Sequence, residues 1–148
     1  MDFKTTLLRT DDDLGPLIAR LAAAIVMFPH GAQKALGWFG GGGFSKTMEG
    51  MTGMGLPSLI VFLVIVAEFL GPLALAAGFL SRAAAAGFVA VMVGAIVTVH
   101  GQHGFFMDWY GQQGAQGFEY HLLMIGLALV VMVRGGGAFS VDGRLVRS

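Results

Sequence analysis

The chain has 148 residues, of which 55% are hydrophobic and only 12% are charged, whereas a soluble domain usually carries about 25% charged residues. Its nine basic and nine acidic residues balance, so we expect no basic patch and no nucleic-acid partner. The absence of cysteine excludes disulfides, zinc–thiolate sites, iron–sulfur clusters and a CxxC redox cycle run by this chain alone. These values predict one membrane domain over residues 1–148, surrounded by lipid.

The first apolar segment follows a polar tail that ends in the acidic run Asp11–Asp12–Asp13, and it extends from about residue 14 to residue 34. A cleaved signal peptide is the alternative interpretation of such a segment. Arg20 interrupts the apolar run, and no clean small-x-small cleavage motif follows it. The pattern therefore favours a retained transmembrane helix.

The second apolar segment, residues 57–80, follows a predicted outer loop over residues 35–56. Its twenty-two residues from Leu59 to Leu80 contain one charge, Glu68. A helix of that length crosses a hydrocarbon core of about 30 Å. A carboxylate at that depth is costly unless it faces protein or water and has a partner, so Glu68 marks a candidate functional site.

Two further helices are predicted over residues 83–101 and 118–134, separated by a second outer loop over residues 102–117. The fourth segment is short for a full membrane crossing. Together the four segments predict an all-α fold, an integral membrane four-helix bundle.

The distribution of Lys and Arg predicts the orientation of this bundle. The two tails and the second connection hold six basic residues, and the first and third connections hold two. The positive-inside rule then places both termini in the cytoplasm. The residues are Lys4, Arg9, Arg82, Arg134, Arg144 and Arg147 on the predicted inner side, with Lys34 and Lys46 on the outer side.

Arg20 and Glu68 are the two charges deep in apolar segments. Counting residues along the helices places them roughly one helical turn apart in depth. We therefore expect a buried Arg20–Glu68 ion pair, which either clasps the bundle or relays protons.

A second polar group falls at the predicted outer ends of the helices. It comprises His30, Lys34, His100, His103, Glu119 and His121. Glu119 and His121 are two residues apart and point to nearly opposite sides of a helix, and we expect Glu119 to face inward. Three interpretations stay open: a pocket for a quinone-like molecule with His and Lys donors, a metal site formed by His100, His103 and His30, or polar residues that solvate helix ends.

Several motifs resemble the DoxX family of small bacterial and archaeal membrane proteins. They are RLAAAIVMFPHGAQKALG, FGGGGF, GMGLP, AEFLGPLALAAGFLSR, GFEYHLLMIGLALVVM and GGGAFSVDGRL, within residues 14–145. The resemblance points to Arg20, His30, Gly31, Lys34, Glu68, Glu119, Ser140 and Asp142, and less directly to His100 and His121. In the closing motif, Ala138 and Phe139 replace the more common Arg and Tyr.

The resemblance implies a four-helix protein of the inner (plasma) membrane. Relatives resemble small subunits of thiosulfate–quinone oxidoreductases, and others are linked to quinone or catechol resistance and to complexes with soluble redox partners. We therefore expect a membrane component of a redox or detoxification system that binds a quinone-like molecule at the outer face. Arg20, His30, Lys34, Glu68, His100 and Glu119 would bind the ligand or relay protons.

A metal-binding protein, a scaffold for soluble redox partners, and a small transporter are the alternatives. Homo-oligomer formation is also compatible with the sequence.

Overall fold

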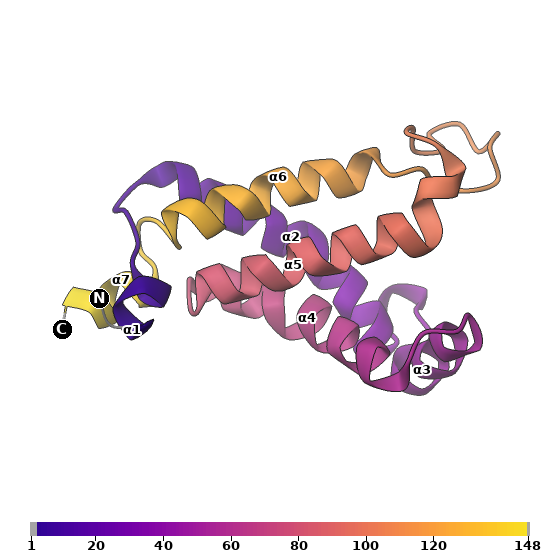
Figure 1. The fold of residues 1–148 in the computed structure, drawn as a ribbon, viewed down its shortest axis with the longest axis horizontal. Coiled ribbons are helices and arrows are strands. Elements are labelled where there is room, and N and C mark those ends of the chain that lie inside the picture. Colours follow the sequence, from indigo (N-terminus) through magenta and orange to yellow (C-terminus); the bar gives the residue numbers. More distant parts are fainter. Residues whose placement is uncertain (1–2, 148) are drawn as a thin grey trace.

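The computed structural model describes residues 3–147, which form helices joined by turns and loops with no strand in that range (Figure 1). The principal helices are α2 (Leu14–Leu36), α4 (Ser58–Ala77), α5 (Ser81–Ala95) and α6 (Glu119–Arg134). The shorter ones are α1 (Phe3–Leu8), α3 (Gly43–Gly53) and α7 (Val141–Arg147), with a 3-10 turn at Trp38–Gly40.

Three segments are long and apolar enough to cross a membrane. They are α2, α4, and α5 together with its continuation to His103. Helix α6 has 16 residues, which at 1.5 Å per residue gives about 24 Å, somewhat less than a hydrocarbon core. The fold is therefore that of an all-α membrane protein.

The four principal helices pack in a cycle, in which α2 and α5 each contact both α4 and α6. Small side chains of α2, including Ala23 and Ala24, meet Phe88 of α5 and Met124 of α6 in the core. Small residues let helix backbones approach closely, which drives association where lipid surrounds the helices. Outward positions such as Ile25, 71% exposed, present apolar side chains to the surroundings.

The predicted third helix, residues 83–101, is only partly a regular α-helix. Helix α5 ends at Ala95, and the chain continues as a π-helical turn, Ile96–His100, and a 3-10 turn, Gly101–His103. The widened turn changes the direction in which His100 points relative to a regular helix. The predicted outer loop 35–56 likewise contains α3, which packs against α2 and α4.

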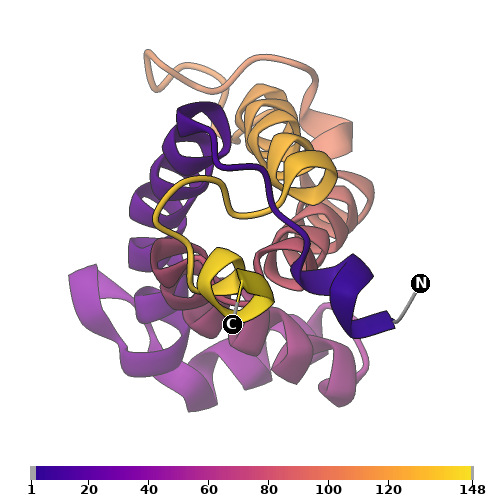
Figure 2. The ribbon, with the colours of Figure 1, turned by 90° about the vertical axis from the view of Figure 1, so that its left-hand side faces the viewer.

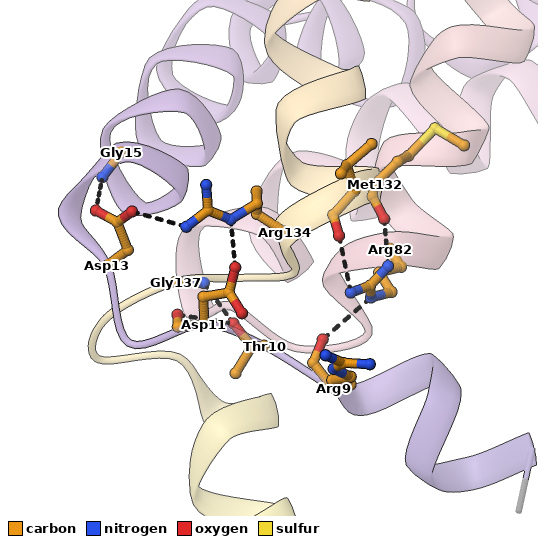
Figure 3. A network of polar contacts seen from close by, with 10 residues as sticks. Arg9, Thr10, Asp11, Asp13, Gly15, Arg82, Met132, Arg134 and Gly137 are labelled. Carbon is orange, nitrogen blue, oxygen red and sulfur yellow. Dashed lines mark hydrogen bonds and ion pairs between the residues drawn. The ribbon is translucent and has the colours of Figure 1, made fainter. Parts of the chain in front are cut away.

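Both ends of the chain lie at the same end of the molecule (Figures 1 and 2). A polar network ties this terminal end together (Figure 3). Arg134 forms ion pairs with Asp11 and Asp13. Arg82 donates to the backbone carbonyls of Arg9, Met132 and Val133. Cations at the last carbonyls of α6 are favourable because they face the negative end of the helix dipole.

Candidate functional site

Arg20 lies in the interior of the terminal half of the bundle and is 2% exposed. Its guanidinium donates to the carbonyls of Leu75 and Ala76 at 2.7 and 2.6 Å, at the C-terminal end of α4. It also donates to Gly136 at 2.7 Å and Ala138 at 3.3 Å. The guanidinium therefore caps α4 and fastens the loop before α7 to it.

This arrangement corrects the predicted Arg20–Glu68 ion pair. Arg20 is level with Leu75, and Glu68 precedes Leu75 by seven residues, or about 10 Å along the helix. The sequence-based estimate of one helical turn was too small because it did not fix the stagger between α2 and α4. Glu68 instead forms an ion pair with Lys34.

The closing motif of the chain completes the clasp around Arg20. The Asp142 carboxylate accepts hydrogen bonds from the backbone N–H groups of Leu80 and Ser81, each at 2.8 Å. These are unpaired donors of the first turn of α5, so Asp142 caps that helix from a distant part of the chain. Ser140 accepts from the Gly143 N–H at 3.1 Å. Arg20, Ser140 and Asp142 thus act together to hold the terminal end.

The Lys34–Glu68 ion pair lies at a close contact between α2 and α4. The Glu68 side chain is 6% exposed, and that of Lys34 is 29% exposed. Gly31, one helical turn before Lys34, lies against the backbone of Glu68 with no room for a Cβ atom. The glycine allows the two helices to approach, and this approach brings the ammonium to the carboxylate.

Aromatic and imidazole rings extend from this ion pair toward the end of the molecule away from the termini. The His30 and Tyr120 ring centroids are 5.9 Å apart, and those of Tyr120 and His121 are 5.5 Å apart. His121 and His100 follow at 4.2 Å. The His100 Nδ1 is 2.8 Å from the Gln116 carbonyl. We call Lys34, Glu68, His30, Tyr120, His121 and His100 the distal polar cluster.

Two buried polar atoms of the distal polar cluster have no hydrogen-bond partner among the described residues. They are the Tyr120 hydroxyl and the Nδ1 atom of His121. The His121 side chain is on the inner face of α6 and is 6% exposed. More than 90% of buried polar groups in folded proteins have a partner. Two unpartnered atoms on adjacent residues therefore point to a small polar ligand or to water at this place.

His121 corrects the prediction that Glu119 faces inward. Glu119 is partly exposed and accepts a hydrogen bond from the Trp109 indole, so it fastens the loop over residues 102–117. His121 shares its face with the buried residues Met124, Ala128 and Val131. That spacing of three, seven and ten residues was the sequence signal that would have identified His121. Tyr120 carried no comparable signal.

The metal interpretation requires three converging ligands, and the described residues do not form such a set. No group of three or more His, Asp or Glu side chains within residues 3–147 could hold a metal ion. His103 is exposed, and its Nε2 lies 3.5 Å from the amide nitrogen of the neighbouring Gln102. The predicted pairing of His100 with His103 assumed a regular helix, and the π and 3-10 turns replace that helix.

The fold and the site define a class: a small helical membrane protein with a buried ion pair and a polar cluster between its helices. The chain belongs to the DoxX family, whose model matches residues 15–101. The resemblance noted in the sequence is thereby confirmed, and the protein is a DoxX-family protein of the inner membrane.

Two named relatives are similar to this chain over most of their length. "Inner membrane protein YqjF" of Escherichia coli strain K12 is 33% identical over 134 residues, which cover 88% of this chain and 92% of that protein. "Putative oxidoreductase CatD" of Bacillus subtilis strain 168 is 27% identical over 119 residues, covering 80% of this chain and 79% of that protein. No solved structure gave a significant match.

Proposed function

We propose that the distal polar cluster binds a quinone-like molecule and that the protein serves as the membrane component of a redox or detoxification system. The observation that carries this proposal is the pair of unpartnered atoms, the Tyr120 hydroxyl and His121 Nδ1. Both can donate to a carbonyl oxygen, which is the hydrogen-bonding group of a quinone. The surrounding rings and apolar side chains suit a flat, apolar molecule.

The ion pair beside these atoms supports proton exchange with the ligand. The partly exposed Lys34 and the buried Glu68 form an acid–base pair between α2 and α4, two helices that are apolar enough to span the membrane. Ionisable groups at such positions commonly mark proton relays. His121 and His100 continue the row of titratable groups as far as Gln116, in the exposed loop before α6. These titratable groups would exchange protons with a ligand that takes up or releases protons.

The comparisons agree with this proposal at a coarse level. One relative is named "Inner membrane protein YqjF", and the other is named "Putative oxidoreductase CatD". The balance of basic residues predicts that the distal end faces away from the cytoplasm. Soluble redox partners would then supply or remove electrons.

The test is the binding of a short-chain quinone to the protein purified in detergent. Tyr120→Phe removes one hydroxyl from the distal polar cluster, and Tyr110→Phe removes one from a side chain that is 87% exposed in the outer loop. Losing one hydrogen bond of about 1 kcal/mol raises the dissociation constant about fivefold. We expect this change in Tyr120→Phe and parental affinity in Tyr110→Phe. Equal affinity in both variants and in the His121→Phe variant would contradict the proposal.

A further inference from the structure

The terminal end of the molecule, far from the distal polar cluster, has a cavity of about 480 Å³. It is lined by Asp12, Phe139, Ser140, Arg144 and Arg147. Figure 2 shows α7 lying across this end of the bundle, close to the chain that leads into α2. Asp12 precedes the start of α2 by two residues. The cavity therefore lies where a spanning helix leaves the hydrocarbon core, at the depth of the lipid headgroups.

The two arginines of this cavity, Arg144 and Arg147, are held less firmly than three other arginines at the terminal end. Arg20, Arg82 and Arg134 are bound to carbonyls or carboxylates. The Arg144 side chain has no hydrogen bond or ion pair among the residues that the structure describes. The Arg147 guanidinium donates to the Gly143 carbonyl at 3.1 Å and to Asp12 at 3.4 Å, and the side chains of Arg147 and Asp12 are both more than 60% exposed. Such an exposed pair is weak and can exchange its carboxylate for another anion.

Helix α7 is held in a fixed position although its outer face is exposed. Ser140 and Asp142 are 2% and 1% exposed and anchor the helix to the bundle. Arg144 and Arg147 are three residues apart and lie on the same face. Two guanidinium groups on an anchored helix are a suitable arrangement for a phosphate, which accepts paired hydrogen bonds from arginine.

Phe139 adds an apolar element to the cavity. Its φ is 57°, a left-handed conformation that is unusual for a bulky residue, and its side chain is 76% exposed. Leu145 and Val146 in α7 are also exposed, at 46% and 44%. Aromatic and aliphatic side chains beside basic ones are typical of a segment that rests in the membrane interface.

We propose that this cavity binds the headgroup of an anionic phospholipid, with the phosphate held by Arg144 and Arg147 and the glycerol and first acyl carbons against Phe139. Asp12 competes for Arg147 and limits the affinity. The occupant is a lipid because apolar and cationic side chains line one cavity at headgroup depth. A free phosphate has no apolar part that could contact Phe139.

The experiment measures binding of phosphatidylglycerol to the full chain in detergent by native mass spectrometry. Phosphatidylcholine and inorganic phosphate are added in parallel. Arg144→Gln is the decisive variant because the Arg144 side chain makes no hydrogen bond or ion pair among the described residues. Lys46→Gln, with the same loss of charge at an exposed position of α3, is the matched control. We expect about fivefold weaker phosphatidylglycerol binding in Arg144→Gln, parental binding in Lys46→Gln, and tighter binding in Asp12→Asn.

Three results would overturn the proposal. The first is equal phosphatidylglycerol binding in the parent, Arg144→Gln and Asp12→Asn. The second is displacement of the lipid by millimolar inorganic phosphate, which would assign the cavity to a free anion. The third is a change of oligomeric state in Arg144→Gln without a change in lipid binding, which would assign the surface to a second copy of the chain.

Discussion

Gly31 of α2 lies directly on the backbone of α4 at Glu68, so closely that a methyl group on Gly31 would overlap the Glu68 carbonyl oxygen. The overlap is with main-chain atoms, which cannot move aside as a flexible side chain can. The contact fixes the stagger of α2 against α4 and, with it, the distance from Lys34 to the Glu68 carboxylate. A single glycine thus determines whether the buried ion pair can form.

Gly31→Ala should therefore destabilise the fold although alanine is the better helix former. Forcing a methyl group into a packed contact costs about 1–3 kcal/mol. Gly94→Ala and Gly126→Ala are the controls, because a Cβ atom at either position meets no atom within 4 Å. These two changes should be neutral or stabilising by up to about 1 kcal/mol. Melting temperatures measured in detergent distinguish the outcomes. Equal melting temperatures of all three variants would contradict the close contact between Gly31 and the Glu68 backbone.

The partner of Glu68 can be identified by double-mutant cycles. Lys34→Met and Glu68→Leu should show a coupling energy of about 0.5–3 kcal/mol, because the two side chains form one ion pair. Arg20→Met and Glu68→Leu should be additive within about 0.5 kcal/mol, because they lie in separate contacts. The reverse result, with coupling to Arg20 and none to Lys34, would restore the pairing expected from the sequence.

Asp142 should contribute more to stability than an ordinary surface carboxylate. Its two backbone hydrogen bonds are charge-assisted, and the one from Ser81 is buried while the one from Leu80 is partly buried. Asp142→Ala leaves the Leu80 and Ser81 N–H groups without a partner, and we expect a loss of about 2–4 kcal/mol. Glu49→Ala, at an exposed position of α3, should stay within about 0.5 kcal/mol of the parent. Equal effects of the two changes would show that the closing motif is not a clasp.

The loop over residues 102–117 should keep its structure at acidic pH. Backbone N–H groups, first that of Gln113 and then those of Gln112, Gly114 and Gly111, hold the pKa of the Asp108 carboxyl below its usual value of 3.8. A group with a lowered pKa in the folded state stabilises the loop above its unfolded-state pKa, and this contribution disappears as the pH falls through the folded-state pKa. The difference in tryptophan fluorescence between the parent and an Asp108→Asn variant removes the contributions of Trp38 and of the Glu119–Trp109 hydrogen bond. This difference should be constant from pH 7 to pH 4 and change only below 3.8. A change in the difference near pH 5 would contradict the assignment.

The sequence allowed the class of fold to be predicted, because long apolar segments with few charges can only be membrane helices. It also predicted an outer polar group that includes Lys34, His30 and His100, but it assigned Glu68 to a separate pair with Arg20, whereas the structure places Glu68 beside Lys34. It did not predict which charges pair, because the stagger of α2 and α4 depends on the contact at Gly31 and on no local pattern. The expectation that Glu119 faces inward was wrong because His121, and not Glu119, shares the helical spacing of the buried residues Met124 and Ala128. The direction of His100 depends on a π-helical turn, for which the sequence had no signal.

The most direct test of the ligand site is photo-crosslinking with an azido-quinone, followed by mass spectrometry of the labelled peptides. The unpartnered Tyr120 hydroxyl and His121 Nδ1 predict that adducts fall on Tyr120, His121 or the segment around His30. Excess unlabelled quinone should suppress these adducts, and Tyr120→Phe should reduce them. Adducts confined to the lipid-facing residues of α5 or to the terminal cavity, or adducts that excess quinone does not suppress, would contradict a quinone site in the distal polar cluster.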